Sequence, residues 1–349
     1  MRFYLIDALR GIAAMWVVLF HAYEGRHIDK LADWLPIYLE HLLFKIEAGV
    51  PIFFVLSGFV IAHSMNRDIV NGSYMVKFAF RRSIRLDPPY WGSIILFLFV
   101  AWLSSTVKAE PMDWPDINTI IAHMFYTQGL LGLEHINKVY WTLCLEIQFY
   151  IVFCLVLFLL HHIEKFFKSG FLAVFFLIAI ISLLWPTKII SDNLLPGLFL
   201  PHWHAFLLGV FAYWSWQKKI PVYYFYIYST ILLVTVYSSG SEFTLVSAVT
   251  ALLLHECANF GYIASANWRW IQFLGRISYS LYLTHNPITG ASYFIIYRLF
   301  GNSLIIQGFA FVITIIACVA FAFIFWWMFE RWSIQLSKKV ILHKATNKL

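Results

Sequence analysis

The stretch YLIDALRGIAAMWVVLFHA, residues 4–22, decides the fold class of this chain. It is almost continuously apolar and about as long as a membrane-spanning helix, which needs about 20 residues. It nevertheless carries Arg10 and His21, and at about 100° per residue these lie within roughly 20° of one helix face, about 16 Å apart along the axis. An arginine near the centre of such a helix costs on the order of 3 kcal/mol. We therefore expect this face to line protein or a water-filled cavity.

The composition extends this conclusion to the whole chain. Of 349 residues, 61% are hydrophobic and 12% are charged, and the mean hydropathy is +0.74, far from the balance of soluble domains. We therefore predict an all-α polytopic membrane protein. The four cysteines lie in apolar segments, so neither a disulfide framework nor a zinc site is expected. Because Asp7 and Arg10 interrupt the first apolar run, we expect it to be retained rather than cleaved as a signal peptide.

Apolar runs long enough to span a bilayer, or nearly so, recur about ten times. They lie at about 3–22, 47–64, 89–106, 139–160, 170–185, 198–216, 221–238, 242–260, 277–298 and 303–328. A further run at 118–132 is shorter and carries His123 and Gln128. An eleventh span there would reverse the membrane orientation of every later helix and place the basic loops outside, so we expect this run to be interfacial or re-entrant.

The basic residues indicate the orientation. With a cytoplasmic N-terminus, 17 of the 25 lysines and arginines fall in cytoplasmic segments and seven fall outside, as the positive-inside rule requires. Both termini are then cytoplasmic. We expect one transmembrane domain, residues 1–335, followed by a basic cytoplasmic tail, residues 336–349.

A cytoplasmic stretch, FAFRRSIRLDPPYW at residues 78–91, places Arg81, Arg82 and Arg85 just before Pro88 and Pro89. Positive-inside anchoring explains part of this charge. Three guanidinium groups also suit bidentate binding of phosphates, as on acyl-coenzyme A arriving from the cytosol.

Two further segments carry polar side chains inside apolar runs. Glu146 lies within VYWTLCLEIQFY, residues 139–150, and needs a cation or a proton there. It either pairs with Arg10 structurally or takes part in function. His285 ends FLGRISYSLYLTH, residues 273–285, and either serves the site or binds backbone carbonyls freed by Pro287.

Taken in order, these elements resemble one family. Arg10 and His21 are followed by the S-G-F at residues 57–59, the R-x-x-R ending at Arg85, the W-x-L-x-x-E-x-x-F-Y at 141–150 and the S-x-S-L-Y-L-x-H ending at His285. The ordered set is similar to the acyltransferase-3 family of integral-membrane O-acyltransferases, over about residues 3–335. One departure is Thr142, where that family more often has serine.

The resemblance implies transfer of a short acyl group, acetyl above all, from acyl-coenzyme A to a hydroxyl of a saccharide or glycolipid, such as an O-antigen, in the bacterial inner membrane. It implies that His21 and Arg10 belong to the active site and that Arg82 and Arg85 serve the coenzyme. We expect His21 to act as general base, Arg10 to bind the anionic donor or a developing oxyanion, and Glu146 to orient or charge-balance this pair. Further expected coenzyme contacts are Arg81, Ser57 and Tyr90, and expected substrate contacts are Trp141, Tyr150, Tyr282 and His285.

The expected partners are acyl-coenzyme A, a glycan acceptor and membrane lipid, with no metal and no nucleic acid; a homo-oligomer is left open. The alternative is a proton-coupled transporter of a small anionic or sugar substrate, in which Arg10, His21 and Glu146 would be relay or substrate sites. The sequence has no evident pair of similar halves, which disfavours this alternative.

Overall fold

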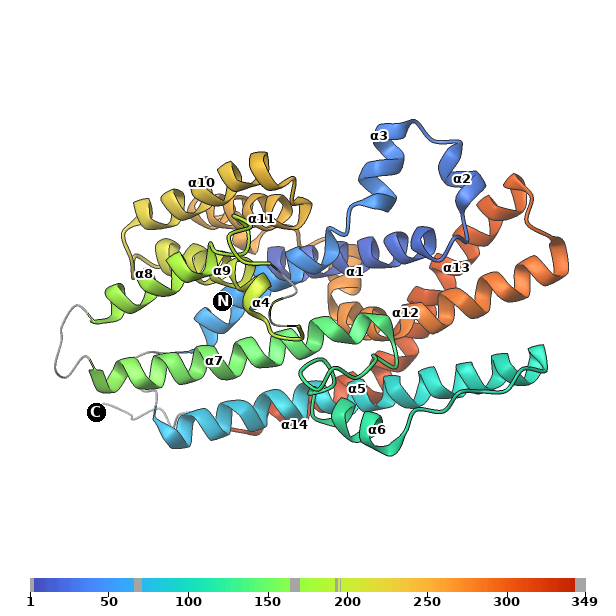
Figure 1. Ribbon diagram of the computed structural model, residues 1–349, viewed down its shortest axis with the longest axis horizontal. Helices are drawn as coiled ribbons and strands as arrows, with labels where there is room; N and C mark the ends of the chain where they lie inside the picture. Colours follow the sequence, from blue (N-terminus) through green and yellow to red (C-terminus); the bar gives the residue numbers. More distant parts are fainter. Residues whose placement is uncertain (1–2, 66–70, 164–169, 192–193, 195, 343–349) are drawn as a thin grey trace.

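The computed structural model describes residues 3–65, 71–163, 170–191, 194 and 196–342, and in these residues it is helical with no strand (Figure 1). The all-α prediction is confirmed, and each of the ten apolar runs forms a helix. These helices are α1 (Tyr4–Glu24), α4 (Gly49–Ser64), α5 (Gly72–Lys108), α7 (Trp141–Ile163), α8 (Gly170–Ser182), α9 (Trp203–Trp216), α10 (Val222–Ser239), α11 (Glu242–Asn259), α12 (Arg269–Phe300) and α13 (Leu304–Phe325).

Short helices fill the connections. They include α2 (Asp29–Asp33), α3 (Ile37–Glu40), the π-helix η1 (His41–Lys45), α6 (Ile117–Met124), the π-helix η7 (Trp326–Glu330) and α14 (Arg331–Lys338). Helix α14 crosses the expected domain boundary at residue 335. The segments around Arg67, Lys165 and Lys168, and residues 343–349 of the expected tail, lie outside the described residues.

By length and composition, five of the described helices are long and apolar enough to cross a membrane, or up to six if one bent helix pair is counted as a single span. The predicted count of ten is therefore not established. Helix α9 shows why, because it has 14 residues and thirteen of them, Trp203 to Ser215, are buried by its neighbours. A helix that is apolar all round and covered by protein need not have the length of a lipid-facing span.

Helix α5 starts earlier than expected, because it runs through Pro88 and Pro89 rather than beginning there. A proline inside a helix leaves the carbonyl four residues earlier without its usual donor. The carbonyl of Arg85, which Pro89 leaves free, accepts a hydrogen bond from Ser333 Oγ at 3.2 Å. The neighbouring carbonyl of Leu86 accepts one from the Tyr279 hydroxyl at 3.0 Å. Helix α14 thus supplies a donor for the carbonyl that Pro89 leaves free, and α12 adds a hydrogen bond beside it.

The segment 118–132 does not form an eleventh span. Its helix, α6, has eight residues, about 12 Å of rise, and is too short to cross a bilayer. The segment folds back along α5, where the Tyr126 hydroxyl donates to Asp87 at 3.0 Å and the Tyr126 ring stacks on Tyr90 with centroids 4.5 Å apart. This course fits both the interfacial and the re-entrant alternative.

Glycines bring two helix pairs into backbone contact. A Cβ on Gly58 would lie 1.9 Å from the Phe206 carbonyl oxygen, and one on Gly209 would lie 1.9 Å from that of Val55, so α4 and α9 cross at these positions. Small residues allow such close approach between membrane helices.

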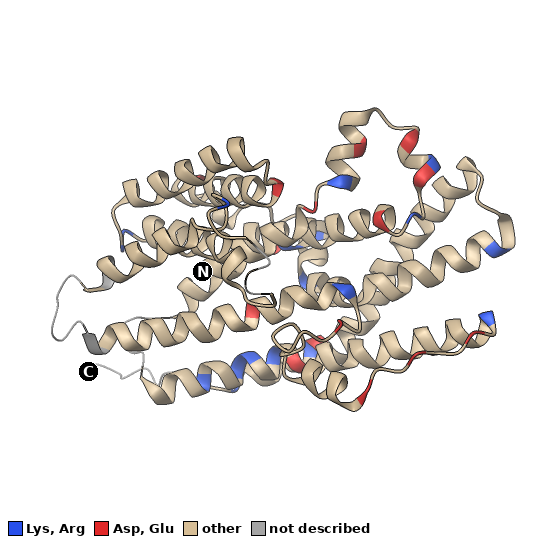
Figure 2. Ribbon diagram, viewed as in Figure 1, with Lys and Arg blue, Asp and Glu red and all other residues tan. Residues whose placement is uncertain are grey.

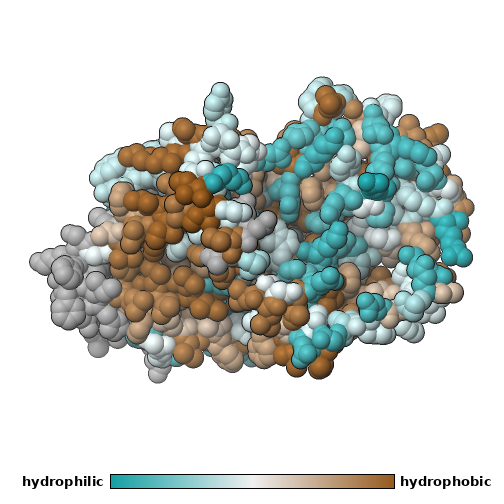
Figure 3. Space-filling view, in the orientation of Figure 1, coloured by the Kyte–Doolittle hydropathy of each residue, from teal (hydrophilic) through white to brown (hydrophobic). Residues whose placement is uncertain are grey.

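Charge and apolar surface are unevenly distributed. The arginines of α5 lie in its first half, whereas many acidic residues lie toward the end of the molecule that carries α2, α3 and the chain leaving α5 (Figure 2). In the same view, apolar side chains cover the surface over α7 and α8, and hydrophilic ones gather toward the acidic end (Figure 3). This separation agrees with a basic inner end and an acidic outer end.

Candidate active site

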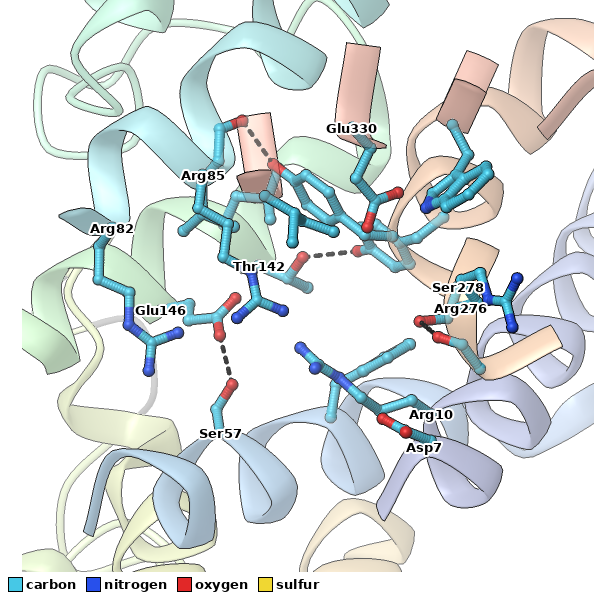
Figure 4. Close-up of a pocket in the computed structure, with 18 of the residues that line it drawn as sticks. Asp7, Arg10, Ser57, Arg82, Arg85, Thr142, Glu146, Arg276, Ser278 and Glu330 are labelled. Atoms are coloured by element: carbon cyan, nitrogen blue, oxygen red, sulfur yellow. Dashed lines mark hydrogen bonds between the residues drawn. The ribbon is translucent and has the colours of Figure 1, made fainter. Parts of the chain in front are cut away.

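A cavity of about 540 Å³ lies where α1, α4, α5, α7 and α12 meet, closed on one side by η7 and α14. It brings together polar side chains from segments far apart in the sequence (Figure 4). Those side chains are Asp7, Arg10, Ser57, Arg82, Arg85, Thr142, Glu146, Arg276, Ser278, Tyr279, Tyr282, Glu330 and Lys338. Five of them are cations and three are carboxylates.

The contact between α1 and α12 places one wall of this cavity. A Cβ on Gly275 would lie 2.0 Å from the carbonyl oxygen of Asp7, and one on Gly11 would lie 2.8 Å from the backbone nitrogen of Gly275. The two backbones therefore touch, and Arg10 on α1 comes to the same cavity as Arg276 on α12. Glycine is needed at this crossing because any side chain would push the helices apart.

Neutral donors hold the two deeper carboxylates. Glu146 Oε1 accepts hydrogen bonds from the hydroxyls of Ser57 and Tyr150, and these two hydroxyls lie 3.1 Å apart. Glu330 is buried and accepts from the backbone N–H of Ser280 at 3.2 Å and from its hydroxyl at 2.6 Å. Both carboxylates therefore have hydrogen-bond donors that are not arginines.

The cations, by contrast, are left available. In the part of the chain that the structure describes, no ion pair within 4.0 Å joins Arg10, Arg82 or Arg85 to a carboxylate. Arg82 instead lies over the ring of Tyr150, with its guanidinium carbon 4.7 Å from the centroid. A partly buried cation without an anionic partner is costly unless a ligand supplies one. The cavity is therefore suited to an anion.

His21 lies outside this cavity and beside His285. Their ring centroids are 5.0 Å apart. His21 Nδ1 lies 2.9 Å from the Val17 carbonyl oxygen, and His285 Nδ1 lies 2.7 Å from that of Tyr282. Because a carbonyl oxygen only accepts, Nδ1 carries the proton in both neutral rings and Nε2 carries the lone pair. His285 Nε2 is buried without a partner among the described residues, and His21 Nε2 lies 3.7 Å from Glu24 Oε2.

One aromatic layer separates the histidine pair from the cavity. Tyr282 lines the cavity, and its ring centroid lies 6.0 Å from that of His285 and 5.7 Å from that of Phe53. The Tyr282 hydroxyl is fixed at 2.6 Å from Thr142 Oγ1 and 2.8 Å from the Val139 carbonyl oxygen. Arg10 therefore lines the cavity, whereas His21 belongs to the histidine pair about 16 Å further along α1.

Several expected site residues lie elsewhere. Trp141 packs against Phe54 and His202, with centroids 6.3 and 5.5 Å away, and does not line the cavity. Tyr90 is fully buried between Tyr126 and Tyr140. Arg81 is also absent from the lining, although its neighbour Arg82 is part of it.

Sequence reasoning missed three charged residues of the cavity, Glu330, Arg276 and Lys338. Glu330 follows the last apolar run by two residues, so extending that run would have identified a carboxylate at its end. The other two were counted only as charges that orient the chain. Among the described residues, no group of three histidine, cysteine, aspartate or glutamate side chains is arranged to hold a metal ion.

A second hollow, of about 740 Å³, lies at the acidic end between the last turns of α5 and the segment that follows it. Trp114 is 58% exposed there. The charged groups in its lining are Lys108, Glu110, Asp113, Asp116 and Glu134, with His135 beside them. Burial lowers the pKa of His135 below its ordinary value, so that ring is neutral near pH 7 and the hollow keeps a negative balance.

Comparisons with known proteins identify the family of the chain as a whole. A family model described as an acyltransferase domain matches residues 3–330. The chain is 33% identical to "Protein 2 in picA locus" of Rhizobium radiobacter over 122 residues, which are 34% of this chain and 56% of that protein. It is 28% identical to "Nodulation protein 10" of Rhizobium leguminosarum bv. viciae over 159 residues, 42% of this chain and 41% of that protein.

The chain therefore spans about half the length of the curated relatives it matches, and no solved structure matches it. The family favours the acyltransferase prediction over the transporter alternative. Because the family model covers nearly the whole chain, from residue 3 to residue 330, this membrane protein belongs to the acyltransferase-3 family.

Proposed function

We propose that this protein transfers a short acyl group, acetyl in the first instance, from acyl-coenzyme A to a hydroxyl of a saccharide or glycolipid at the bacterial inner membrane. One observation carries the proposal. Unpaired arginines line a cavity at one level of the bundle, and a histidine pair with free Nε2 atoms lies one aromatic layer further along α1. Coenzyme A has the same division, with its phosphates separated from its thioester by the pantetheine arm.

The donor enters among Arg10, Arg82 and Arg85, where bidentate hydrogen bonds hold its phosphates. Its thioester then points past Phe53 and Tyr282 toward His21. Passage requires the two rings to part, because they are in contact in the structure.

The chemical step uses His21 Nε2 as general base. It takes the proton of the acceptor hydroxyl as the oxygen bonds to the thioester carbon, and the tetrahedral intermediate collapses with cleavage of the carbon–sulfur bond. The proton on His21 then passes to the departing thiolate, which gives an ester and coenzyme A with the histidine restored. A proton transfer of this kind contributes about 10²–10⁴ in rate.

The acceptor approaches from the outer end. The hollow around Trp114 offers an exposed aromatic face and four carboxylates, groups that suit stacking on a sugar ring and accepting hydrogen bonds from its hydroxyls. Tyr126, another aromatic residue of this outer segment, is buried against Tyr90 and Asp87 and does not take this role.

The test uses the purified protein in lipid nanodiscs with acetyl-coenzyme A and a bacterial envelope extract, without an ion gradient. We expect thiol release that depends on the extract, together with an alkali-labile acetyl ester on a glycan. Movement of substrate across proteoliposomes without any thiol release would instead support the transporter alternative.

A further inference from the structure

The rim of the cation-lined cavity carries two charges that the R-x-x-R motif does not include. Arg276, on α12, and Lys338, at the end of α14, both line the cavity and are both exposed. Arg10, Arg82 and Arg85 are only partly exposed. The cations therefore occur at two depths, with the exposed pair at the rim.

The rim pair has no carboxylate partner in the described part of the chain. Among the described residues, neither Arg276 nor Lys338 forms an ion pair with a carboxylate. The Arg276 guanidinium carbon lies 5.9 Å from the ring centroid of Trp326, which also lines the cavity. The indole N–H of Trp326 is buried and has no acceptor in the described part of the chain. Two cations and a spare N–H donor next to an aromatic face form an incomplete site for a phosphorylated aromatic group.

The order of groups along coenzyme A decides which of its phosphates reaches the rim. The diphosphate lies next to the pantetheine arm, and the 3′-phosphate lies on the adenosine at the opposite end from the thioester. With the thioester directed inward, the diphosphate falls among the deeper arginines and the adenosine end falls at the exposed rim. Stacking on an indole is open to any base, since each presents a π-face.

We propose that Arg276, Lys338 and Trp326 form a subsite for the 3′-phosphoadenosine end of the donor, and that the two rim cations bind its 3′-phosphate. This inference rests on the proposed function, because it assumes that the donor is a coenzyme A thioester. The 3′-phosphate is a monoester and carries more charge per phosphorus than the diphosphate. Two exposed cations at the mouth suit such a terminal dianion.

The test compares the binding of acetyl-coenzyme A and 3′-dephospho-acetyl-coenzyme A to the purified protein in nanodiscs by isothermal titration calorimetry. The wild type should bind acetyl-coenzyme A at least about tenfold more tightly than it binds the 3′-dephospho compound, as charge-assisted contacts would give. Arg276→Ala and Lys338→Ala should each lower the affinity for acetyl-coenzyme A severalfold to tenfold. Their affinity for the dephospho compound should equal that of the wild type. Arg269→Ala, on the same helix, and Lys339→Ala, the next residue, are matched controls outside the lining and should keep the wild-type preference.

Equal affinity of the wild type for both thioesters would overturn the subsite. An equal loss of affinity for both thioesters in the two variants would also overturn it, because the rim cations would then act only through their general positive charge. Binding of neither thioester would contradict the proposed function itself. If Arg276→Ala does not fold, Arg276→Gln keeps the length of the side chain, and it should likewise lose the preference.

Discussion

At the scale of single residues, His21 and His285 are held in the same tautomer by backbone carbonyls of their own helices. This leaves both Nε2 lone pairs in one small region, so His21 is not alone as a proton acceptor there. His21 remains the better general base, because its side chain is 12% exposed whereas His285 is fully buried. His285 is then placed to receive a hydrogen bond from the acceptor or from protonated His21.

Replacing His21 should therefore lower the rate of acyl transfer and leave the affinity for the acyl donor unchanged. We expect His21→Ala to lower acyl transfer by about 10²–10⁴, the usual value of one catalytic proton transfer. Acetyl-coenzyme A affinity should stay near wild type because Arg10 lies about 16 Å away along α1, and Arg82 and Arg85 lie on α5. Turnover in nanodiscs measures the first quantity and calorimetry the second, with the exposed His41→Ala as control. Near-normal turnover in His21→Ala would remove this residue from the mechanism.

The neighbouring arginines of α5 should behave differently. Arg82 lines the cavity and Arg81 does not, so Arg82→Ala should weaken acetyl-coenzyme A binding by about tenfold or more, from charge-assisted contacts of roughly 1.5–3 kcal/mol. Arg81→Ala should have a clearly smaller effect. Titration calorimetry on both variants, with folding checked by size-exclusion chromatography, compares them directly. Equal losses would show that only the net charge of the segment matters.

At the scale of elements, the ten helices could be predicted from the apolar runs, because long apolar segments in a membrane protein have few other conformations. The start of α5 could not. Its two prolines indicate a helix start, and the donor for the carbonyl that Pro89 leaves free, Ser333, comes from a distant segment. The same limit applies to the site, since the contributions of Arg276 and Lys338 depend on how α12 and α14 pack against α5.

Helical spacing also explains which expected site residues do not line the cavity. Trp141 precedes Glu146 by five residues and so lies about 140° away around α7, whereas Tyr150 follows by four and shares its face. Tyr90 follows Arg85 by five residues and so also lies about 140° away from it, around α5. The motifs thus identify the helices that build the site more reliably than the face of each helix that lines it.

The crossing of α1 and α12 can be tested with two glycines of one helix. A Cβ on Gly275 would meet the Asp7 carbonyl oxygen at 2.0 Å, whereas one on Gly290 would meet nothing within 4 Å. We expect Gly275→Ala to destabilise the protein by about 1–3 kcal/mol through overpacking, and Gly290→Ala to leave stability equal or slightly higher. Thermal unfolding followed by size-exclusion chromatography in detergent gives both values. Equal midpoints for the two variants would show that the helices do not touch there.

At the scale of the whole molecule, the uneven charge distribution determines which substrate meets which end. The cation-lined cavity includes Arg82 and Arg85 from the first half of α5, and the hollow around Trp114 lies beside the last turns of that helix. By the positive-inside rule the first faces the cytosol and the second the exterior. In the proposed function, the donor and the acceptor then reach the histidine pair from opposite sides of the membrane.

Two exposed positions test this orientation, Ser73 near the start of α5 and Asn118 in α6. After the native cysteines are replaced, Asn118→Cys should react with an impermeant thiol reagent in intact cells and Ser73→Cys should not. Both should react once the cells are opened. Labelling of Ser73→Cys from outside would reverse the topology and the assignment of the donor side.

The central claim, that this protein places acyl groups on a surface glycan through His21, is tested most directly by mass spectrometry of cell-surface glycans. Three otherwise identical strains would be compared, one with the gene, one without it and one producing His21→Ala at wild-type level. The account predicts an alkali-labile acyl ester, detected as the added mass of an acetyl group, in the first strain only. Identical glycans in all three strains, or the same ester in the His21→Ala strain, would contradict it.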